Sequence, residues 1–254
     1  MHEAGTITVN VTQGVATLCF QHPKKNALTR TLLNDLAGEI TRLGNQHDAR
    51  VIVLKSAGED VFCSGAYFQE LLAIGSIEQG KEFFMGFARL ILAMKRCPKF
   101  IIARIQGKTI GGGVGIVAAS DYALALTTAS IKLSELDLGL GPFVVGPAIE
   151  RKLGMAAFSA LALDTTWRDA AWAKQHGLYT EVFATVSDLD AATSSLAHRL
   201  AKSSPEAMAK LKAVFWEGSE HWDALLETRA EISGRLVLSD VTAQALAAFK
   251  HSQA

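Results

Sequence analysis

Short, uninterrupted apolar runs recur along the first half of the chain and constrain its fold more than any other feature. They occupy residues 51–54 (VIVL), 100–103 (FIIA) and 122–126 (YALAL). A run of this length without polar alternation is typical of a strand that is covered on both faces. Helical patterns at 82–94 and 113–119 lie between the runs. Strands that alternate with helices in this way predict an α/β fold.

The N-terminal segment predicts a hairpin followed by a helix. Residues 6–11 and 15–20 alternate apolar and polar side chains around Gln13-Gly14, which suits two paired strands. A turn cluster at 22–26 (HPKKN) comes next, and the stretch 29–43 then places its leucines and Ile40 on one helical face.

Helical patterns dominate the chain from residue 148 onward. The expected helices are 148–153, 156–163, 168–175, 189–202, 205–216 and 221–238, with one strand-like piece at 179–184. We therefore divide the chain into a strand-rich core, 1–188, and a helical C-terminal region, 189–254. No Pro/Ser-rich linker separates them, so the two parts are expected to pack tightly together.

Composition narrows the classes of function. A chain of 254 residues suits one substantial α/β domain. With 25 basic and 25 acidic residues, no broad field favours nucleic acid or an anionic membrane. No apolar run reaches transmembrane length and no signal peptide is evident. Three isolated cysteines indicate free thiols and a cytoplasmic location, and no metal site is expected. Hydrophobic content of 49% is compatible with subunit association.

Three segments rich in small residues are the candidates for chemistry: 62–67 (FCSGAY), 105–115 (IQGKTIGGGVG) and 132–143 (KLSELDLGLGPF). Small residues let a ligand approach backbone N–H groups at helix starts, and two such donors form an oxyanion hole. Taken alone, the Gly111–Gly113 run fits close helix–strand packing better than a ligand site. It is neither a Walker A loop, since no GK[ST] follows, nor a dinucleotide fingerprint, since Ile116 stands where glycine is required.

In this order and spacing, the segments resemble the enoyl-CoA hydratase/isomerase (crotonase) superfamily over nearly the whole chain. Residues 22–28 (HPKKNAL) resemble the P-x-x-x-N-A-L segment that helps to hold CoA, one residue shorter here. The 62–66 segment resembles the first oxyanion segment, which implies the Ala66 N–H as a donor. The 105–113 segment resembles the second, which implies the Gly112 N–H. Residues 134–142 resemble the P-E-x3-G-x2-P stretch, which implies Glu135 as the acid/base group.

The resemblance also implies a fold and an assembly. It implies a crotonase-like spiral of ββα repeats with a helical C-terminal trimerisation region, in homotrimers or hexamers. An acyl-CoA thioester of fatty acid metabolism is the implied substrate, with no cofactor apart from the coenzyme A that the substrate carries. The substrate-binding candidates are Lys24, Lys25, Ala27, Ser64, Tyr67 and Gly111. Lys24 and Lys25 fit phosphate contacts to CoA or solvated turn charges about equally.

One departure from the family pattern bears on the reaction. Hydratases of the best-known type carry a second glutamate two residues beyond the GGG run, where this chain has Gly115. Adding water requires a positioned water as well as proton transfer, whereas one base suffices to move a double bond. A lone Glu135 therefore favours isomerisation. Residues 135–143 also resemble the mitochondrial type of Δ3,Δ2-enoyl-CoA isomerase, one residue shorter before Pro-Phe.

Other functions stay open. Hydration remains possible if Asp137 or Tyr67 supplies a second group; in an extended segment Asp137 shares the side of Glu135. Tyr67 also replaces the family's frequent Asp after the oxyanion Ala. A decarboxylase is disfavoured because residues 68–74 contain no lysine. A non-catalytic acyl-CoA-binding paralogue is the alternative from another class, and a nucleotide-binding oxidoreductase is disfavoured. The aromatic residues that either line an acyl pocket or belong to the core are Tyr67, Phe68, Phe83, Phe84 and Phe87.

Overall fold

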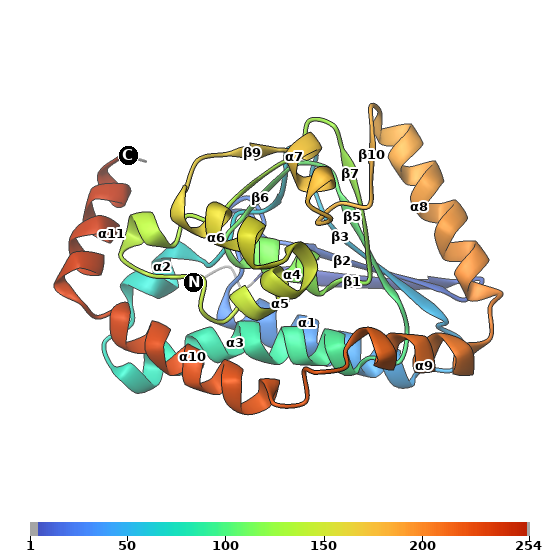
Figure 1. The fold of residues 1–254 in the computed structure, drawn as a ribbon, viewed down its shortest axis with the longest axis horizontal. Helices are drawn as coiled ribbons and strands as arrows, with labels where there is room; N and C mark the ends of the chain where they lie inside the picture. The colour runs from blue at the N-terminus through green and yellow to red at the C-terminus, as the bar shows by residue number, and fades with distance from the viewer. Residues whose placement is uncertain (1–4, 253–254) are drawn as a thin grey trace.

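The computed structural model describes residues 5–252, with side chains through 248, and contains two sheets (Figure 1). Residues 1–4 and 253–254, which the predicted domain ranges include, lie outside the described residues. The larger sheet has the spatial order β1 (Thr6–Thr12), β2 (Val15–Gln21), β3 (Val51–Ser56), β5 (Ile101–Ile105), β7 (Tyr122–Leu126), β10 (Glu181–Phe183). The β1–β2 pair is the predicted antiparallel hairpin, and all the other neighbours are parallel.

The smaller sheet carries the segments of chemical interest. Its order is β4 (Val61–Cys63), β6 (Lys108–Ile110), β8 (Ser130–Lys132), β9 (Arg168–Asp169). The first three strands are parallel, and β9 is antiparallel to β8. The helix predicted at 168–175 therefore begins two residues late, because Arg168 and Asp169 pair with β8 before α7 (Ala170–Gln175) starts.

The two sheets result from one repeating unit. The chain enters the larger sheet at β3, crosses to the smaller sheet at β4, and returns through the helices α2 (Phe68–Leu72) and α3 (Ile77–Arg96). The next turn runs β5, β6 and α4 (Gly112–Ala119), and a third runs β7, β8 and α5 (Gly146–Leu153). Each turn adds one neighbouring strand to each sheet. The predicted spiral of ββα repeats is confirmed.

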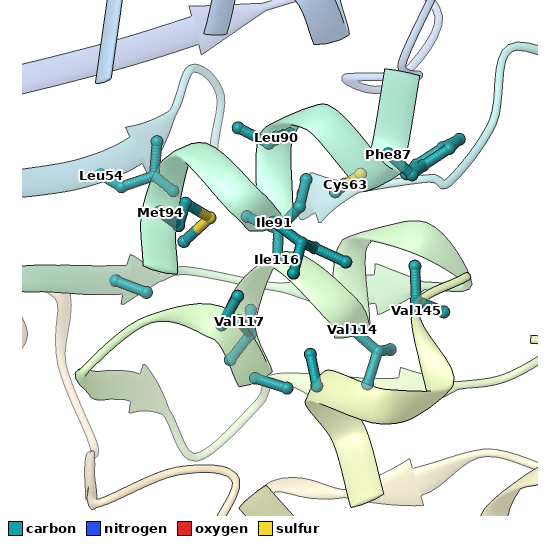
Figure 2. Close-up of a cluster of buried hydrophobic side chains, with 14 of the residues drawn as sticks. Leu54, Cys63, Phe87, Leu90, Ile91, Met94, Val114, Ile116, Val117 and Val145 are labelled. Carbon is teal, nitrogen blue, oxygen red and sulfur yellow. The ribbon is translucent and has the colours of Figure 1, made fainter. Parts of the chain in front are cut away.

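The core lies where the helices meet the sheets. All eight residues of α4 are buried, because the helix carries no polar side chain to place in solvent. Figure 2 shows α3 crossing α4, with Ile91 and Ile116 between the two helices and Val145 beside Val114. Helix α1 (Arg30–Asn45) packs beside α3, and its N-terminus is capped by the Thr29 side chain, which accepts from the Leu32 N–H at 3.0 Å.

The remaining helices pack directly on this core. They are α6 (Met155–Leu163), α8 (Val186–Ala201), α9 (Pro205–Phe215), α10 (Trp222–Leu236) and α11 (Asp240–Ser252). Helix α8 covers β2, β3, β5, β7 and β10, α10 lies along α3, and α11 contacts the 3-10 turn at Leu136–Leu138 (Figure 1). The division of the chain after residue 188 stays a prediction.

Two further findings concern the described part of the chain. The three thiols are unpaired; Cys63 and Cys97 are buried and Cys19 is half-buried. Within residues 5–252, no helix is long and apolar enough to cross a bilayer, and no group of three His, Cys, Asp or Glu side chains is placed to hold a metal.

Candidate active site

The three small-residue segments meet because each follows the end of one strand in the smaller sheet. Ser64-Gly65-Ala66 follows β4, Gly111-Gly112 follows β6, and Ser134-Glu135 follows β8. These strands are parallel neighbours with β6 in the middle, so their carboxyl ends lie at one edge. Neighbouring strands are ~4.8 Å apart, which brings the three segments within ~10 Å of one another. The carboxyl edge of parallel strands is where such folds bind ligands.

A cavity of about 1100 Å³ opens at this edge. All nine residues predicted for the site line it: Lys24, Lys25, Ala27, Ser64, Ala66, Tyr67, Gly111, Gly112 and Glu135. The sequence segments thus converge on a single space, although the role of each residue stays a prediction. The volume is slightly above the ~300–1,000 Å³ that is usual for small-molecule sites.

The backbone around Ala66 leaves its N–H available. Ala66 forms a parallel bridge with Leu28, in which the Leu28 N–H donates to the Gly65 carbonyl at 2.8 Å and the Leu28 carbonyl accepts from Tyr67 N–H at 2.9 Å. In a parallel bridge these bonds involve the residues on either side of Ala66, so the N–H of Ala66 itself points away from Leu28. Among the described residues no acceptor is recorded for it.

Gly112 offers a second N–H at the start of α4. The N–H of Gly111 before it donates to the Lys132 carbonyl at 2.9 Å, and the positive φ of Gly111, 54°, turns the chain into the helix. N–H groups in a first helical turn have no intrahelical partner, and the helix dipole favours negative charge there. Glycine is required at 112, because a Cβ would lie 2.1 Å from the Phe87 ring.

Glu135 lies against this helix start. A Cβ on Gly111 would be 3.1 Å from the Glu135 Oε1, so the carboxyl group is in contact with the residue that precedes Gly112. The residue as a whole is half-buried, but its Oε2 is closed off from solvent and has no hydrogen-bond partner within the described chain. Burial raises the pKa of Glu135 from 4.5 to about 7, against the opposing effect of hydrogen bonds from its own and the Ser134 N–H. A carboxyl group with this pKa can both take and return a proton near neutral pH.

The loop at 22–26 is fastened beside the first oxyanion segment. Lys25 and Asn26 have positive φ values of 53° and 56°, and the Asn26 amide donates to the carbonyls of Ala57 and Val61 at 2.7 and 2.8 Å. The Ser64 hydroxyl and N–H donate to the carbonyls of Lys24 and Lys25, each at 3.2 Å. Both lysine side chains are exposed at the cavity. The loop thus holds two cations where an anionic ligand would enter.

Asp137 does not share the side of Glu135, because the segment is not extended. Residues Leu136–Leu138 form a 3-10 turn that rotates Asp137 toward the rim of the cavity. There its carboxylate lies 3.1 Å from the Lys132 amine and accepts from the Thr165 hydroxyl at 2.6 Å. Burial acts to raise the pKa of Asp137, but the bonds from Thr165 and Lys132 outweigh it and lower the pKa. An ionised carboxylate with two partners is a poor proton carrier.

The place of the missing second carboxylate is filled by Val145. A Cβ added to Gly115 would lie 2.5 Å from the Val145 Cβ and 2.7 Å from its Cγ1. Val145 also lines the cavity, together with Val144 and Leu140. A glutamate at 115 therefore does not fit beside Val145, and the cavity wall at this point is apolar.

The sequence did not predict every residue that lines the cavity, and one predicted aromatic residue lies elsewhere. Trp167 and Ser233 line the cavity, the second from α10, far along the chain, and no local pattern marks them. Lys132, the first residue of the predicted 132–143 segment, also lines it. Of the predicted aromatic residues, Tyr67, Phe68, Phe84 and Phe87 line the cavity. Phe83 instead packs in the core, where its exposed fraction is 3%.

Comparison with known proteins agrees with this site and fold. The family model described as enoyl-CoA hydratase/isomerase matches residues 10–248. The chain belongs to the enoyl-CoA hydratase/isomerase family, and the predicted family, fold class and acyl-CoA enzyme class are confirmed.

Individual relatives carry different names within this family. The chain is 30% identical over 230 residues to the peroxisomal Delta(3,5)-Delta(2,4)-dienoyl-CoA isomerase of Arabidopsis thaliana, covering 84% of this chain and 81% of that protein. It is 32% identical over 215 residues to the enoyl-CoA hydratase AKT6-1 of Alternaria alternata, covering 84% and 67%. The crystal structure of an enoyl-CoA hydratase from Mycobacterium avium superposes with a TM-score of 0.86 at 28% identity, covering 99% and 98%.

Proposed function

We propose that this enzyme shifts a carbon–carbon double bond in an enoyl-CoA thioester, from the β,γ to the α,β position. One observation carries the choice of reaction: Glu135 is the only buried carboxyl group among the described residues that line the cavity, and Val145 fills the position where a hydratase carries a second one. Isomerisation moves one proton between two carbons, so a single acid/base group is sufficient.

The proposed chemistry needs only groups of this chain. The Glu135 carboxylate removes a proton from the carbon next to the thioester carbonyl, and the electron pair delocalises through the double bond into a dienolate. The N–H groups of Ala66 and Gly112 stabilise the negative charge that develops on the thioester oxygen. Protonated Glu135 then delivers the proton to the carbon two positions farther along. The substrate loses one proton and gains one, so the reaction consumes no water.

Relatives with other names define the alternatives. Hydration is the second candidate, because a relative of similar identity is named as an enoyl-CoA hydratase. It requires a water molecule activated by a group other than residue 115. Decarboxylation is less favoured, since α2 and the residues after it up to Ile74 contain no lysine. A non-catalytic binding protein would have no need of a buried carboxyl group with a pKa near 7.

The remaining features of the proposal concern ligand and assembly. Coenzyme A enters only as part of the substrate, with its phosphates near Lys24 and Lys25 and its thioester between Ala66 and Gly112. No separate cofactor, nucleic acid or membrane takes part. We place the protein in the cytoplasm as a homotrimer or hexamer, on the basis of its free thiols and its exposed apolar side chains.

Turnover on two substrates tests the reaction. We expect conversion of 3-hexenoyl-CoA to its 2-enoyl isomer to exceed hydration of crotonyl-CoA by at least about a hundredfold in kcat/KM. Binding of a saturated acyl-CoA is measured alongside, so that a binding protein without activity is recognised. Rapid hydration of crotonyl-CoA would overturn the proposal in favour of a hydratase. Binding without either reaction would favour the non-catalytic alternative.

A further inference from the structure

One half of the cavity is built for an apolar group. Away from Lys24 and Lys25, its walls come from α2, α3, the 3-10 turn, the 140–145 segment and α10. The side chains there are Leu71, Phe84, Phe87, Leu138, Leu140, Phe143, Val144 and Val145. If the thioester lies between Ala66 and Gly112 as proposed, with CoA toward the lysines, the acyl chain extends into this half.

Helix α3 sets the depth of the apolar half. Phe87 lies directly beneath Gly112, since a Cβ there would be 2.1 Å from the Phe87 ring. Phe84, about one turn earlier in the helix, also lines the cavity, and Gly80 lies one further turn toward the N-terminus of α3, outside the lining itself. The seven residues from 87 to 80 advance ~10 Å along a helix that rises 1.5 Å per residue.

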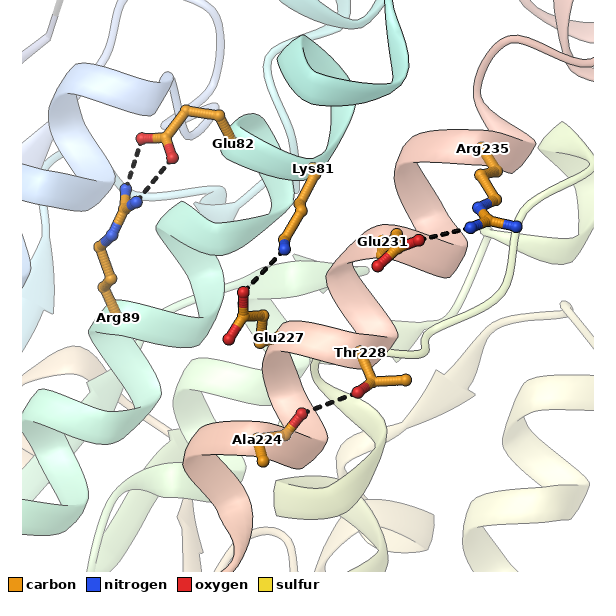
Figure 3. A network of polar contacts seen from close by, with 8 residues as sticks. All are labelled: Lys81, Glu82, Arg89, Ala224, Glu227, Thr228, Glu231 and Arg235. Atoms are coloured by element: carbon orange, nitrogen blue, oxygen red, sulfur yellow. Dashed lines mark hydrogen bonds and ion pairs between the residues drawn. The ribbon is translucent and has the colours of Figure 1, made fainter.

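Helices α3 and α10 touch at Gly80 and Gly234, which do not line the cavity themselves but lie beside the lining residue Ser233. A Cβ on Gly80 would be 2.7 Å from the Gly234 Cα, and one on Gly234 would be 2.5 Å from the Lys81 nitrogen, so the two backbones are in contact. An ion pair between Lys81 and Glu227, 2.7 Å long, joins the same helices (Figure 3). Ser233, next to Gly234, lines the cavity at this point.

Ser233 presents a small, already bonded side chain. Its hydroxyl donates to the Arg229 carbonyl at 3.1 Å, and only 2% of the residue is exposed. The hydroxyl proton is therefore engaged within α10 and does not reach into the cavity for a polar substrate atom. The helix contact at Gly80 fixes this end of the cavity in place, since neither backbone has room to move closer.

We infer that the enzyme takes acyl chains of medium length, about eight carbons, with Ser233 as the specificity-determining residue at the end of the chain. An extended chain advances somewhat less than one C–C bond of about 1.5 Å per carbon, so ~10 Å holds about eight carbons. This inference rests on the proposed position of the thioester. It does not depend on which reaction follows.

Binding of saturated acyl-CoAs, measured by calorimetry, tests the inference without turnover. From butyryl-CoA to octanoyl-CoA we expect affinity to rise by up to about fourfold per methylene group, and to gain nothing further with dodecanoyl-CoA. In Ser233→Phe, octanoyl-CoA binding falls by at least about tenfold while butyryl-CoA binding is retained. Ser233→Val gives an intermediate loss and guards against a misfolded phenylalanine variant.

The matched control is Thr228→Phe. Thr228 lies on the same helix and makes the same bond to the carbonyl four residues earlier, that of Ala224 at 2.9 Å, but it is exposed to solvent (Figure 3). This variant should bind all chain lengths as the parent does. Equal affinity of the parent for butyryl- and octanoyl-CoA, or equal losses for both in Ser233→Phe, would overturn the inference. Absence of isomerisation with these binding trends intact would instead overturn only the proposed reaction.

Discussion

At the scale of single residues, Glu135 joins the chemistry of the site to the stability of the fold. Its carboxyl group is closed off from solvent at Oε2, and no charged partner is recorded for it within the described chain. Burial without an opposite charge disfavours the ionised form, which is why the pKa rises to about 7. The resemblance to a known family predicts Glu135 from the sequence, but its pKa depends on segments far apart in the chain.

Replacing Glu135 by glutamine should abolish turnover and leave acyl-CoA binding intact. Glutamine has nearly the same volume but cannot take up or return the proton. The loss in kcat is expected to be at least about 10²–10⁴-fold, the usual contribution of a general acid/base group. Steady-state assays with 3-hexenoyl-CoA measure turnover, and titration with a saturated acyl-CoA measures binding. Near-native turnover in the variant would mean that another residue carries the proton.

The activity of the parent enzyme should depend on pH through the same group. Glu135 acts first as a base, so the free enzyme must hold it ionised. We expect kcat/KM to rise with pH up to about 7 and to level off above it, following the pKa of Glu135. The profile is measured with 3-hexenoyl-CoA at constant ionic strength. A profile that is flat from about pH 6 to about pH 8 would contradict this assignment.

Stability should respond to pH in the opposite sense. Between pH 4.5 and about 7 the folded state keeps a proton on Glu135 that the unfolded state has released, so rising pH lowers the free energy of unfolding. The total penalty reaches about 3 kcal/mol above pH 7. Glu135→Gln has no such dependence, so its stability relative to the parent should increase by up to this amount across that window. Urea denaturation at several pH values measures it, and a constant difference would refute it.

At the scale of elements, the end of β6, helix α4 and the 140–145 segment decide what the cavity can do. Gly111 contacts Glu135, Gly112 contacts Phe87, and Gly115 contacts Val145. The contacts at Gly112 and Gly115 leave no room for a side chain, and the contact at Gly111 is tight. The three glycines of the helix start are visible in the sequence, but their partners are not, because Phe87 and Val145 belong to other elements.

A side chain at position 115 should therefore be tolerated only with a change at 145. Gly115→Ala is expected to lower the free energy of unfolding by about 1–3 kcal/mol, the usual effect of overpacking. Val145→Gly in the same chain removes the two atoms that clash and should recover part of the loss. Denaturation of the parent, both single variants and the double variant gives the coupling energy. Additive effects would mean that the two residues do not compete for one space.

The elements themselves were largely predictable where a pattern is local. Strand β7 has the predicted bounds. The ends of α1, α3 and α10 differ from the predicted ends by no more than five residues. Strands β4, β6 and β8 have three residues each, too few for a periodic pattern, and only the motifs that follow them pointed to the site. Asp137 turned away from Glu135 because a 3-10 turn replaced the extended segment.

At the scale of the whole molecule, exposed apolar side chains on α9 bear on the proposed assembly. On α9, Leu211, Val214 and Phe215 are exposed by 47%, 55% and 45%. Their spacing of three and four residues places them on one face of the helix. A contiguous apolar face on a surface helix is typical of an interface rather than of a surface in solvent. That the C-terminal helices mediate assembly stays a prediction.

The parent protein should therefore be larger than one chain in solution. Light scattering is expected to give about three times the 27.2 kDa of the chain, or a multiple of that trimer. Leu211→Glu combined with Val214→Glu places two charges on the α9 face, which cannot be buried without a large desolvation penalty, so the assembly should dissociate. Leu163→Glu is the matched control, since Leu163 is 74% exposed on α6, outside the predicted C-terminal region. A parent that is monomeric at micromolar concentration would refute the assembly itself, whereas dissociation by Leu163→Glu alone would move the interface from α9 to α6.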